Sequence, residues 1–231
     1  MTEPAPRKSD LGIRVASAVV MIAVAGTALW LGGISFTILA GVFAATALYE
    51  WQRIVRAMHL SGTVGMLWIV AGVVYIGFAC ASILLFRRIG IPHAILPILV
   101  TIATDTGAYF TGRSIGGPKI APSISPSKTW SGLVGGMIAA GLVGAWWLGQ
   151  FAQHGHWSLK VVAGGFVFGG ILAVVAQIGD FLESGMKRRA GLKDSGAIIP
   201  GHGGVLDRVD GLLAVLCACG VGWLVLTMVI E

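Results

Sequence analysis

Charged residues are scarce in this chain. Of its 231 residues, 16 are Lys or Arg and 10 are Asp or Glu, so that 11% are charged while 56% are hydrophobic. Soluble domains carry about 25% charged residues. Together with a mean hydropathy of +0.86, this composition excludes an ordinary soluble enzyme and a disordered chain. It predicts an integral membrane protein.

Cysteine is also rare, with 3 residues in the whole chain, which excludes a disulfide-stabilised scaffold. Cys80, Cys217 and Cys219 all lie in apolar segments. The Cys-x-Cys pair has no His or acidic residue beside it in the sequence that would complete a metal site. We interpret the three as small buried hydrophobic residues.

Long apolar runs, in contrast, recur along the whole chain, and their lengths are close to the 17–25 residues, roughly, of a membrane-spanning helix. They predict an all-α polytopic integral membrane protein with about seven transmembrane helices. Only Gly32 and Gly33 separate the first two runs, which predicts a tight helical turn, although a re-entrant or tilted arrangement is an alternative. The predicted spans are Val15–Leu31, Ile34–Tyr49, Met66–Phe86, Ile91–Phe110, Leu133–Phe151, Val161–Ile178 and Leu212–Ile230.

Glycine is abundant, at 35 residues, and pairs such as Gly132/Gly136 and Gly165/Gly169 stand four residues apart in predicted helices. Small residues at this spacing let membrane helices approach closely. They predict tight helix packing and carry no chemistry.

The basic residues favour one topology. If the N-terminus is cytoplasmic and the first span is an uncleaved anchor, only Arg87, Arg88 and Lys160 fall on the outer side. The opposite orientation would violate the positive-inside rule. The net charge of +6 is therefore explained by topology, and we expect contact with a lipid bilayer and none with nucleic acid.

Two polar segments interrupt the apolar pattern, Thr104–Gly132 and Gln177–Gly211. Both fall on the predicted cytoplasmic side, and loops of this length are commonly functional. We therefore divide the chain into an N-terminal membrane region, residues 1–103, and a catalytic membrane domain, residues 104–231.

Acidic residues in the second polar segment are spaced for a shared site. If the helix continues past Ile178, then Asp180, Glu183 or Ser184, and Lys187 lie on one face. Asp207 and Asp210 stand three residues apart at the start of the last span. Carboxylates that converge from two helix ends suit Mg²⁺, although they could instead neutralise neighbouring Lys and Arg.

Between these acidic groups lies a glycine-rich stretch, Gly201-His-Gly-Gly204, whose backbone N–H groups can turn towards an anion. Basic side chains surround it in the sequence. Together with a metal they would hold a polyphosphate and stabilise phosphoryl or nucleotidyl transfer. The basic residues are Lys187, Arg188, Lys193 and Arg208.

The order of these residues resembles the signature of the bacterial phosphatidate cytidylyltransferases. The main motif is Ser184-x-Met-Lys187-Arg188-x4-Lys193-Asp194-x-Gly196-x3-Pro200-x-His202-Gly203-Gly204-x2-Asp207-Arg208-x-Asp210. Two further motifs of that family are similar to Asp105-Thr-Gly107-Ala-Tyr109-Phe110-x-Gly112-Arg113 and Ser125-Pro126-Ser127-Lys128-Thr129-Trp130-x-Gly132. The chain departs from the family at Ser131, where Glu is common, and at Ser127, where a second basic residue is common.

The resemblance implies an enzyme that joins CTP and phosphatidic acid to give CDP-diacylglycerol and pyrophosphate for phospholipid synthesis. It implies a homodimer in a bacterial-type inner (plasma) membrane, with the active site facing the cytoplasm. Mg²⁺ would be held by Asp180, Asp207 and Asp210, and a second metal ion stays open. The implied catalytic residues are Asp207, Asp210, Lys187 and Arg208, and the implied substrate-binding residues are Lys128, Ser125, Ser184, Arg188, Lys193, His202, Gly203, Gly204 and Asp105.

Three residues keep two interpretations each. Asp105 either serves the site or pairs with Arg113. His202 either belongs to the glycine-rich turn, which we favour, or acts as a general base, which an already ionised lipid phosphate does not need. Glu50 either serves the site or balances Arg53.

Other functions are weighed against this one. The sequence pattern of the CDP-alcohol phosphotransferases is absent. A polyprenol or dolichol kinase stays an enzyme alternative, and a catalytically inactive scaffold stays open. An ion-coupled transporter using Asp105 and Asp180 is disfavoured because charge gathers at one surface and the sequence shows no internal repeat.

Overall fold

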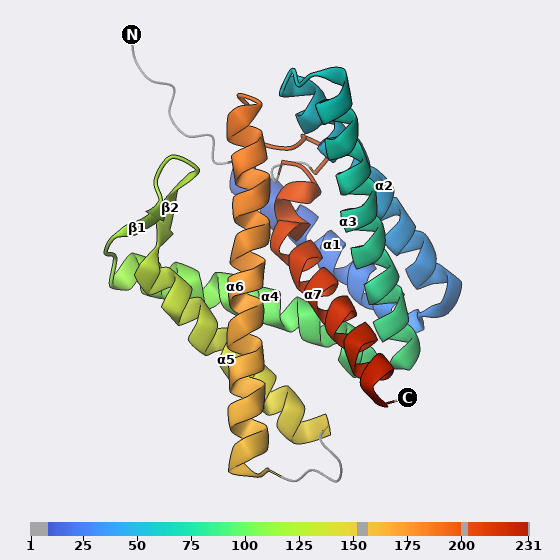
Figure 1. Ribbon diagram of the computed structural model, residues 1–231, viewed down its shortest axis with the longest axis vertical. Helices are drawn as coiled ribbons and strands as arrows, with labels where there is room; N and C mark the ends of the chain where they lie inside the picture. Colours follow the sequence, from blue (N-terminus) through green and yellow to red (C-terminus); the bar gives the residue numbers. More distant parts are fainter. Residues whose placement is uncertain (1–8, 152–156, 200–202, 231) are drawn as a thin grey trace.

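The computed structural model describes residues 9–151, 157–199 and 203–230, which are mostly helical (Figure 1). Each predicted span lies within one helix, so the all-α, multi-pass architecture is confirmed. Among the described residues, six helices are long and apolar enough to cross a membrane, and Val15–Leu31 is a shorter apolar stretch. The elements are α1 (Ser9–Leu31), α2 (Gly33–Ala57), α3 (Gly62–Ile89), α4 (Ile91–Ser114), β1 (Lys119–Ala121), β2 (Ser125–Thr129), α5 (Trp130–Phe151), α6 (Leu159–Arg189) and α7 (Leu206–Ile230).

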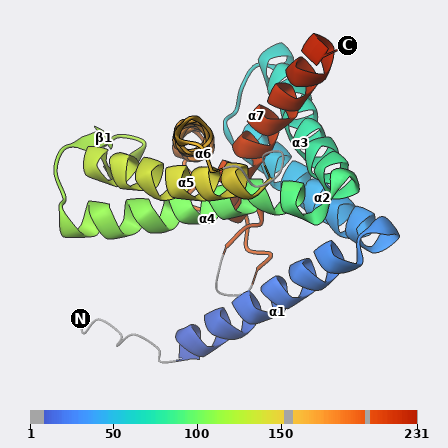
Figure 2. The same cartoon turned by 90° about the horizontal axis from the view of Figure 1, so that it is seen from below.

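The predicted tight turn between the first two helices is present at Gly32 and Gly33, whose φ angles are +64° and +53°. Only glycine adopts such backbone angles at little cost. Arg87 of α3 reaches this turn and donates hydrogen bonds to the carbonyl oxygens of Leu29, at 2.6 Å, and Trp30, at 3.0 Å. The last carbonyls of a helix lack partners within it, so Arg87 completes the end of α1. From the turn the two helices diverge (Figure 2).

Helices α4, α5 and α6 pack closely because glycines line their crossings. A Cβ on Gly136 would lie 2.9 Å from the Thr104 carbonyl oxygen, and one on Gly165 would lie 2.8 Å from the Cα of Ala145. The predicted role of the glycine pairs in close helix packing is thereby confirmed. This group of helices carries the walls of the cavity described below.

Helix α7 joins this group to the rest of the bundle. It packs against α6 on one side and against α3 on the other. At the α6 crossing, Gly179 lies against the backbone of Asp210, with 2.7 Å between a Cβ there and the Asp210 carbonyl oxygen. This crossing therefore brings Asp180 of α6, next to Gly179 in the sequence, close to the backbone of Asp210 of α7.

Two features of the polar segments shape the site. Helix α6 runs 31 residues and continues to Arg189, as the face shared by Asp180 and Lys187 requires. The other polar segment forms a short antiparallel hairpin, which our all-α expectation did not include. In this hairpin Lys119 pairs with Thr129, and Ala121 pairs with Ser125. Figure 1 shows it projecting beside α6.

Candidate active site

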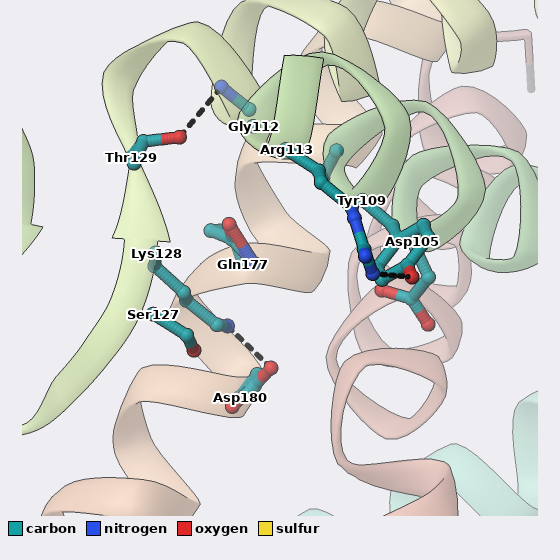
Figure 3. Close-up of a pocket in the computed structure, with 11 residues that line it drawn as sticks. Asp105, Tyr109, Gly112, Arg113, Ser127, Lys128, Thr129, Gln177 and Asp180 are labelled. Atoms are coloured by element: carbon teal, nitrogen blue, oxygen red, sulfur yellow. Dashed lines mark hydrogen bonds and ion pairs between the residues drawn. The ribbon is translucent and has the colours of Figure 1, made fainter. Parts of the chain in front are cut away.

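A cavity of about 430 Å³ lies between the hairpin, α4, α5 and α6. Its polar walls include Asp105, Tyr109 and Arg113 of α4 and Gln177 of α6 (Figure 3). This volume is within the range of small-molecule sites, about 300–1,000 Å³. The hairpin therefore forms one side of a polar cavity.

Lys128 of β2 and Asp180 of α6 form an ion pair within this cavity (Figure 3). The side chain of Lys128 is 15% exposed and that of Asp180 is 30% exposed. Ser184, one helical turn along α6, donates a hydrogen bond to the other oxygen of Asp180 at 3.1 Å. Asp180 therefore contacts two other predicted site residues, Lys128 and Ser184, which come from two separate motifs.

A second charged group lies further along α6. The Nζ of Lys187 is 3.1 Å from Oε2 of Glu183 and 2.6 Å from Oδ1 of Asp207 on α7. Lys187 and Asp207 are both predicted site residues. Glu183 is 3% exposed, and its buried Oε1 accepts no hydrogen bond from the part of the chain that the structure describes. This ion-pair group joins α6 to the start of α7.

Asp207 is held by backbone as well as by Lys187. The Ser195 N–H donates to both of its carboxylate oxygens, at 3.1 and 3.0 Å, and the Gly204 N–H donates to Oδ2 at 2.9 Å. We expected the glycine-rich N–H groups to face an anion; the N–H of Gly204 instead binds this carboxylate. Gly203, also predicted to bind substrate, is next to it with φ +86°. His202 lies outside the described residues.

Glu50 of α2 is a site component whose partners the sequence does not reveal. It is 0% exposed. Its Oε2 accepts hydrogen bonds from the Ser195 hydroxyl at 2.9 Å and the Leu206 N–H at 2.7 Å, and its Oε1 accepts from the Val205 N–H at 3.1 Å. Arg53 donates to the Ser195 carbonyl at 3.2 Å, so it does not serve simply as the partner of Glu50.

The remaining predicted residues lie around these groups. Arg188 donates to the carbonyl of Ile124 at 3.3 Å and so ties α6 to the hairpin. Lys193 and Arg208 are exposed. Ser125 lies at the start of β2, opposite Ala121. None of these contacts tests whether the side chains bind substrate, so their roles stay predictions.

Asp105 was predicted either to serve the site or to pair with Arg113. Arg113 donates to the Tyr109 hydroxyl at 2.8 Å, and no ion pair joins it to Asp105 within the described part of the chain. Asp105 lies in the cavity wall and interacts electrostatically with Asp180 and Lys128. The structure thus places Asp105 with the site.

Ser131 occupies the position at which the family commonly carries Glu. Its hydroxyl donates to the Gly116 carbonyl and lies 3.1 Å from the Thr129 hydroxyl. Ser131 therefore joins the two ends of the hairpin segment. Ser127, the other departure, lines the cavity beside Lys128.

The predicted metal ligands fit a divalent cation only as a smaller set. Within residues 9–151, 157–199 and 203–230, no three His, Cys, Asp or Glu side chains are grouped as metal ligands. Asp207 accepts from Lys187 and from two backbone N–H groups, whereas Asp180 accepts, among the described residues, only from the side chains of Lys128 and Ser184. Asp180 and Asp210 carry like charges that repel each other across the α6–α7 crossing. Mg²⁺ commonly uses one or two carboxylates together with phosphate oxygens and water, so these two aspartates would suffice as protein ligands.

Gln177 and Ser195 are site residues that were not predicted. Gln177 lines the cavity, and Ser195 connects Glu50 with Asp207. Glu183, named above as an alternative on the face shared with Lys187, contacts that lysine. Ser195 lies within the recognised signature, between Asp194 and Gly196, at a position that the motif leaves open. Gln177 lies at the end of a predicted span, where an amide is unusual.

The fold and site together define a multi-pass membrane protein that gathers carboxylates and basic side chains around a polar cavity. A sequence model described as the Cytidylyltransferase family matches residues 62–226. The chain belongs to this family.

Individual relatives extend the match. The phosphatidate cytidylyltransferase of Brucella suis is 34% identical over 250 aligned positions, covering 89% of this chain and 90% of the relative. That of Rickettsia bellii is 32% identical, covering 90% and 88%. That of Staphylococcus haemolyticus is 41% identical over a shorter stretch, covering 62% and 54%.

Proposed function

We propose that this protein transfers CMP from CTP to phosphatidic acid, giving CDP-diacylglycerol and pyrophosphate for phospholipid synthesis. The observation that carries the proposal is the contact of Lys128, from one motif, with Asp180, one helical turn before the main signature, in a polar cavity. Membership of the Cytidylyltransferase family and relatives named phosphatidate cytidylyltransferase over about nine-tenths of the chain support it.

In this reaction a phosphate oxygen of the lipid attacks the α-phosphorus of CTP. The bond from that phosphorus to the bridging oxygen of the β-phosphate breaks, and its electron pair leaves with pyrophosphate. Both substrates are anions, so the protein must hold them together against their repulsion. Lys128, in the cavity wall, and Lys187, further along α6, would bind the phosphates, and a carboxylate holds each of them in place. Arg188, Lys193 and Arg208 would add charge nearer the surface.

Mg²⁺ is the proposed cofactor, and a second metal ion stays open. When bound it would neutralise charge on the polyphosphate. Asp180 and Asp210 are the proposed protein ligands; Asp207 would instead orient Lys187, which it contacts at 2.6 Å. Asp105, in the cavity wall, would position the substrate or its metal.

The protein is a multi-pass membrane protein, and we propose the bacterial inner membrane as its location. The distribution of Lys and Arg supports a cytoplasmic N-terminus and a cytoplasmic active site. A homodimer is likewise proposed, and cross-linking in native membranes would test it. Glycine-rich helix faces are compatible with such an assembly.

Product analysis tests the activity. Purified protein in detergent micelles receives phosphatidic acid, labelled CTP and Mg²⁺, alongside an Asp180→Asn variant and a Lys160→Gln control. Lys160 is exposed and lies near the far end of α6. CDP-diacylglycerol and pyrophosphate from parent and control, but not from Asp180→Asn, are expected. Release of CDP with phosphorylation of a polyprenol would instead identify a lipid kinase.

A further inference from the structure

Glu50 is the only buried acidic residue of α2, and it lies before residue 62, where the family match begins. Its hydrogen-bond partners stand 145 to 156 residues further along the chain. We propose that Glu50 is a positioning residue of the active site. It holds the loop before α7 so that Asp207 and Lys187 take their places; this role rests on the proposed function.

The first part of the argument concerns the cost of burying Glu50. A carboxylate with no exposure to solvent is expensive unless it is paired or hydrogen-bonded. In the described part of the chain Glu50 forms no ion pair. Instead it accepts two N–H groups at the start of α7 and one hydroxyl. The first N–H groups of a helix lack partners within it, and the N-terminus favours negative charge.

The second part concerns the space around it. A Cβ on Gly204 would lie 2.6 Å from Oε2 of Glu50, and one on Gly196 would collide with Oε1. Both glycines lie in the recognised signature. Gly196 and Gly204 therefore both lie directly against this carboxylate.

The third part is the connection to the reacting groups. Ser195 donates its hydroxyl to Glu50 and its backbone N–H to Asp207. Gly204, next to the Val205 that Glu50 binds, donates its N–H to Asp207 as well. Asp207 in turn binds Lys187. An unbroken series of hydrogen bonds thus runs from α2 to the lysine proposed to bind phosphate.

The test compares Glu50→Gln and Glu50→Asp with a Tyr49→Phe control in the full-length protein. Gln has the same size, but its amide group turns a donor towards backbone N–H groups or the Ser195 hydroxyl. Asp keeps the charge with a shorter reach. Tyr49 is 63% exposed and precedes Glu50. Two readouts are taken: kcat and KM for CTP per folded molecule, and hydrogen exchange of the peptide spanning residues 195–206.

For Glu50→Gln we expect faster exchange of this peptide and a kcat lower by about 10- to 100-fold, since misplacement of about 1 Å can cost 10²-fold. Glu50→Asp should recover part of kcat, and Tyr49→Phe should match the parent. A purely structural role would reduce folded yield and leave kcat and KM of the folded fraction unchanged; that result overturns the proposal.

Unchanged exchange in Glu50→Gln also overturns it, whatever the activity. If the parent makes no CDP-diacylglycerol, the proposed function fails, and the exchange measurement still decides whether Glu50 holds the loop.

Discussion

Lys187 and Asp207 join two helices through a contact of 2.6 Å between Nζ and Oδ1. Both side chains are nearly buried, with exposures of 12% and 9%. Glu183 shares the same lysine, so one cation serves two carboxylates. The position of Lys187 therefore matters for stability as well as for any substrate that it binds.

Replacing Lys187 with Met should destabilise the protein and reduce turnover. Removing one partner of a buried ion pair leaves an uncompensated charge and costs about 3–5 kcal/mol, and here two carboxylates lose their cation. Thermal unfolding in detergent measures the change. Lys160→Met, at an exposed position of the same helix, should unfold like the parent; equal unfolding temperatures for all three proteins would contradict the prediction.

Replacing Asp180 with Asn should reduce product formation by about 100-fold or more, the scale on which the loss of one electrostatic contact acts in an active site. Asn cannot neutralise Lys128 and is a poor ligand for a cation. Initial rates at saturating CTP measure the effect. Ser184→Ala removes only a hydrogen bond to the same carboxylate and should cost much less; similar losses in both variants would argue against a special role for the charge.

Removal of divalent metal should abolish activity, and Mg²⁺ should restore it. If Asp210 contributes a ligand, Asp210→Asn should need about 10-fold more Mg²⁺ for half-maximal rate, because a hard cation favours carboxylate oxygen. A titration of rate against free Mg²⁺ measures this. The same titration with Asp207→Asn separates the two carboxylates, since Asp207 is proposed to orient Lys187. A chelator-resistant rate would exclude the metal.

A pair of neighbouring glycines tests the helix packing. A Cβ on Gly165 would lie 2.8 Å from Ala145 Cα, whereas nothing lies within 4 Å of one on Gly164. Gly165→Ala should destabilise by about 1–3 kcal/mol through overpacking, and Gly164→Ala should be neutral or stabilise by up to about 1 kcal/mol. Unfolding in detergent compares the two. The opposite order would mean that α5 and α6 cross elsewhere.

The helices could be predicted from sequence because membrane spans are long and apolar. The condition for Asp180 and Lys187 to share one face, a helix that continues past Ile178, is met because α6 runs to Arg189. The hairpin was missed because it has only 3 and 5 residues in its strands and includes Pro126, so no alternating pattern develops. Lys128 was nevertheless predicted as a site residue, because that prediction came from the motif and not from the hairpin.

The partners of Glu50 could not be predicted for a different reason. Two of its three donors are backbone N–H groups, which every residue except proline possesses, so side-chain identity carries no signal. The same holds for Asp207, which the sequence suggested as a metal ligand. Asp207 accepts hydrogen bonds from the backbone N–H groups of Ser195 and Gly204. These contacts depend on the folded loop, so the sequence alone does not predict them.

The contact between Glu50 and Leu206 spans 156 residues, and this separation orders events during synthesis. A ribosome makes α2 well before α7, so the carboxylate of Glu50 lacks these partners until the start of α7 has been made. The site can therefore assemble only after α7 has been made. A nascent chain that stops before Leu206 would lack this hydrogen bond and the first turn of α7 with Asp207.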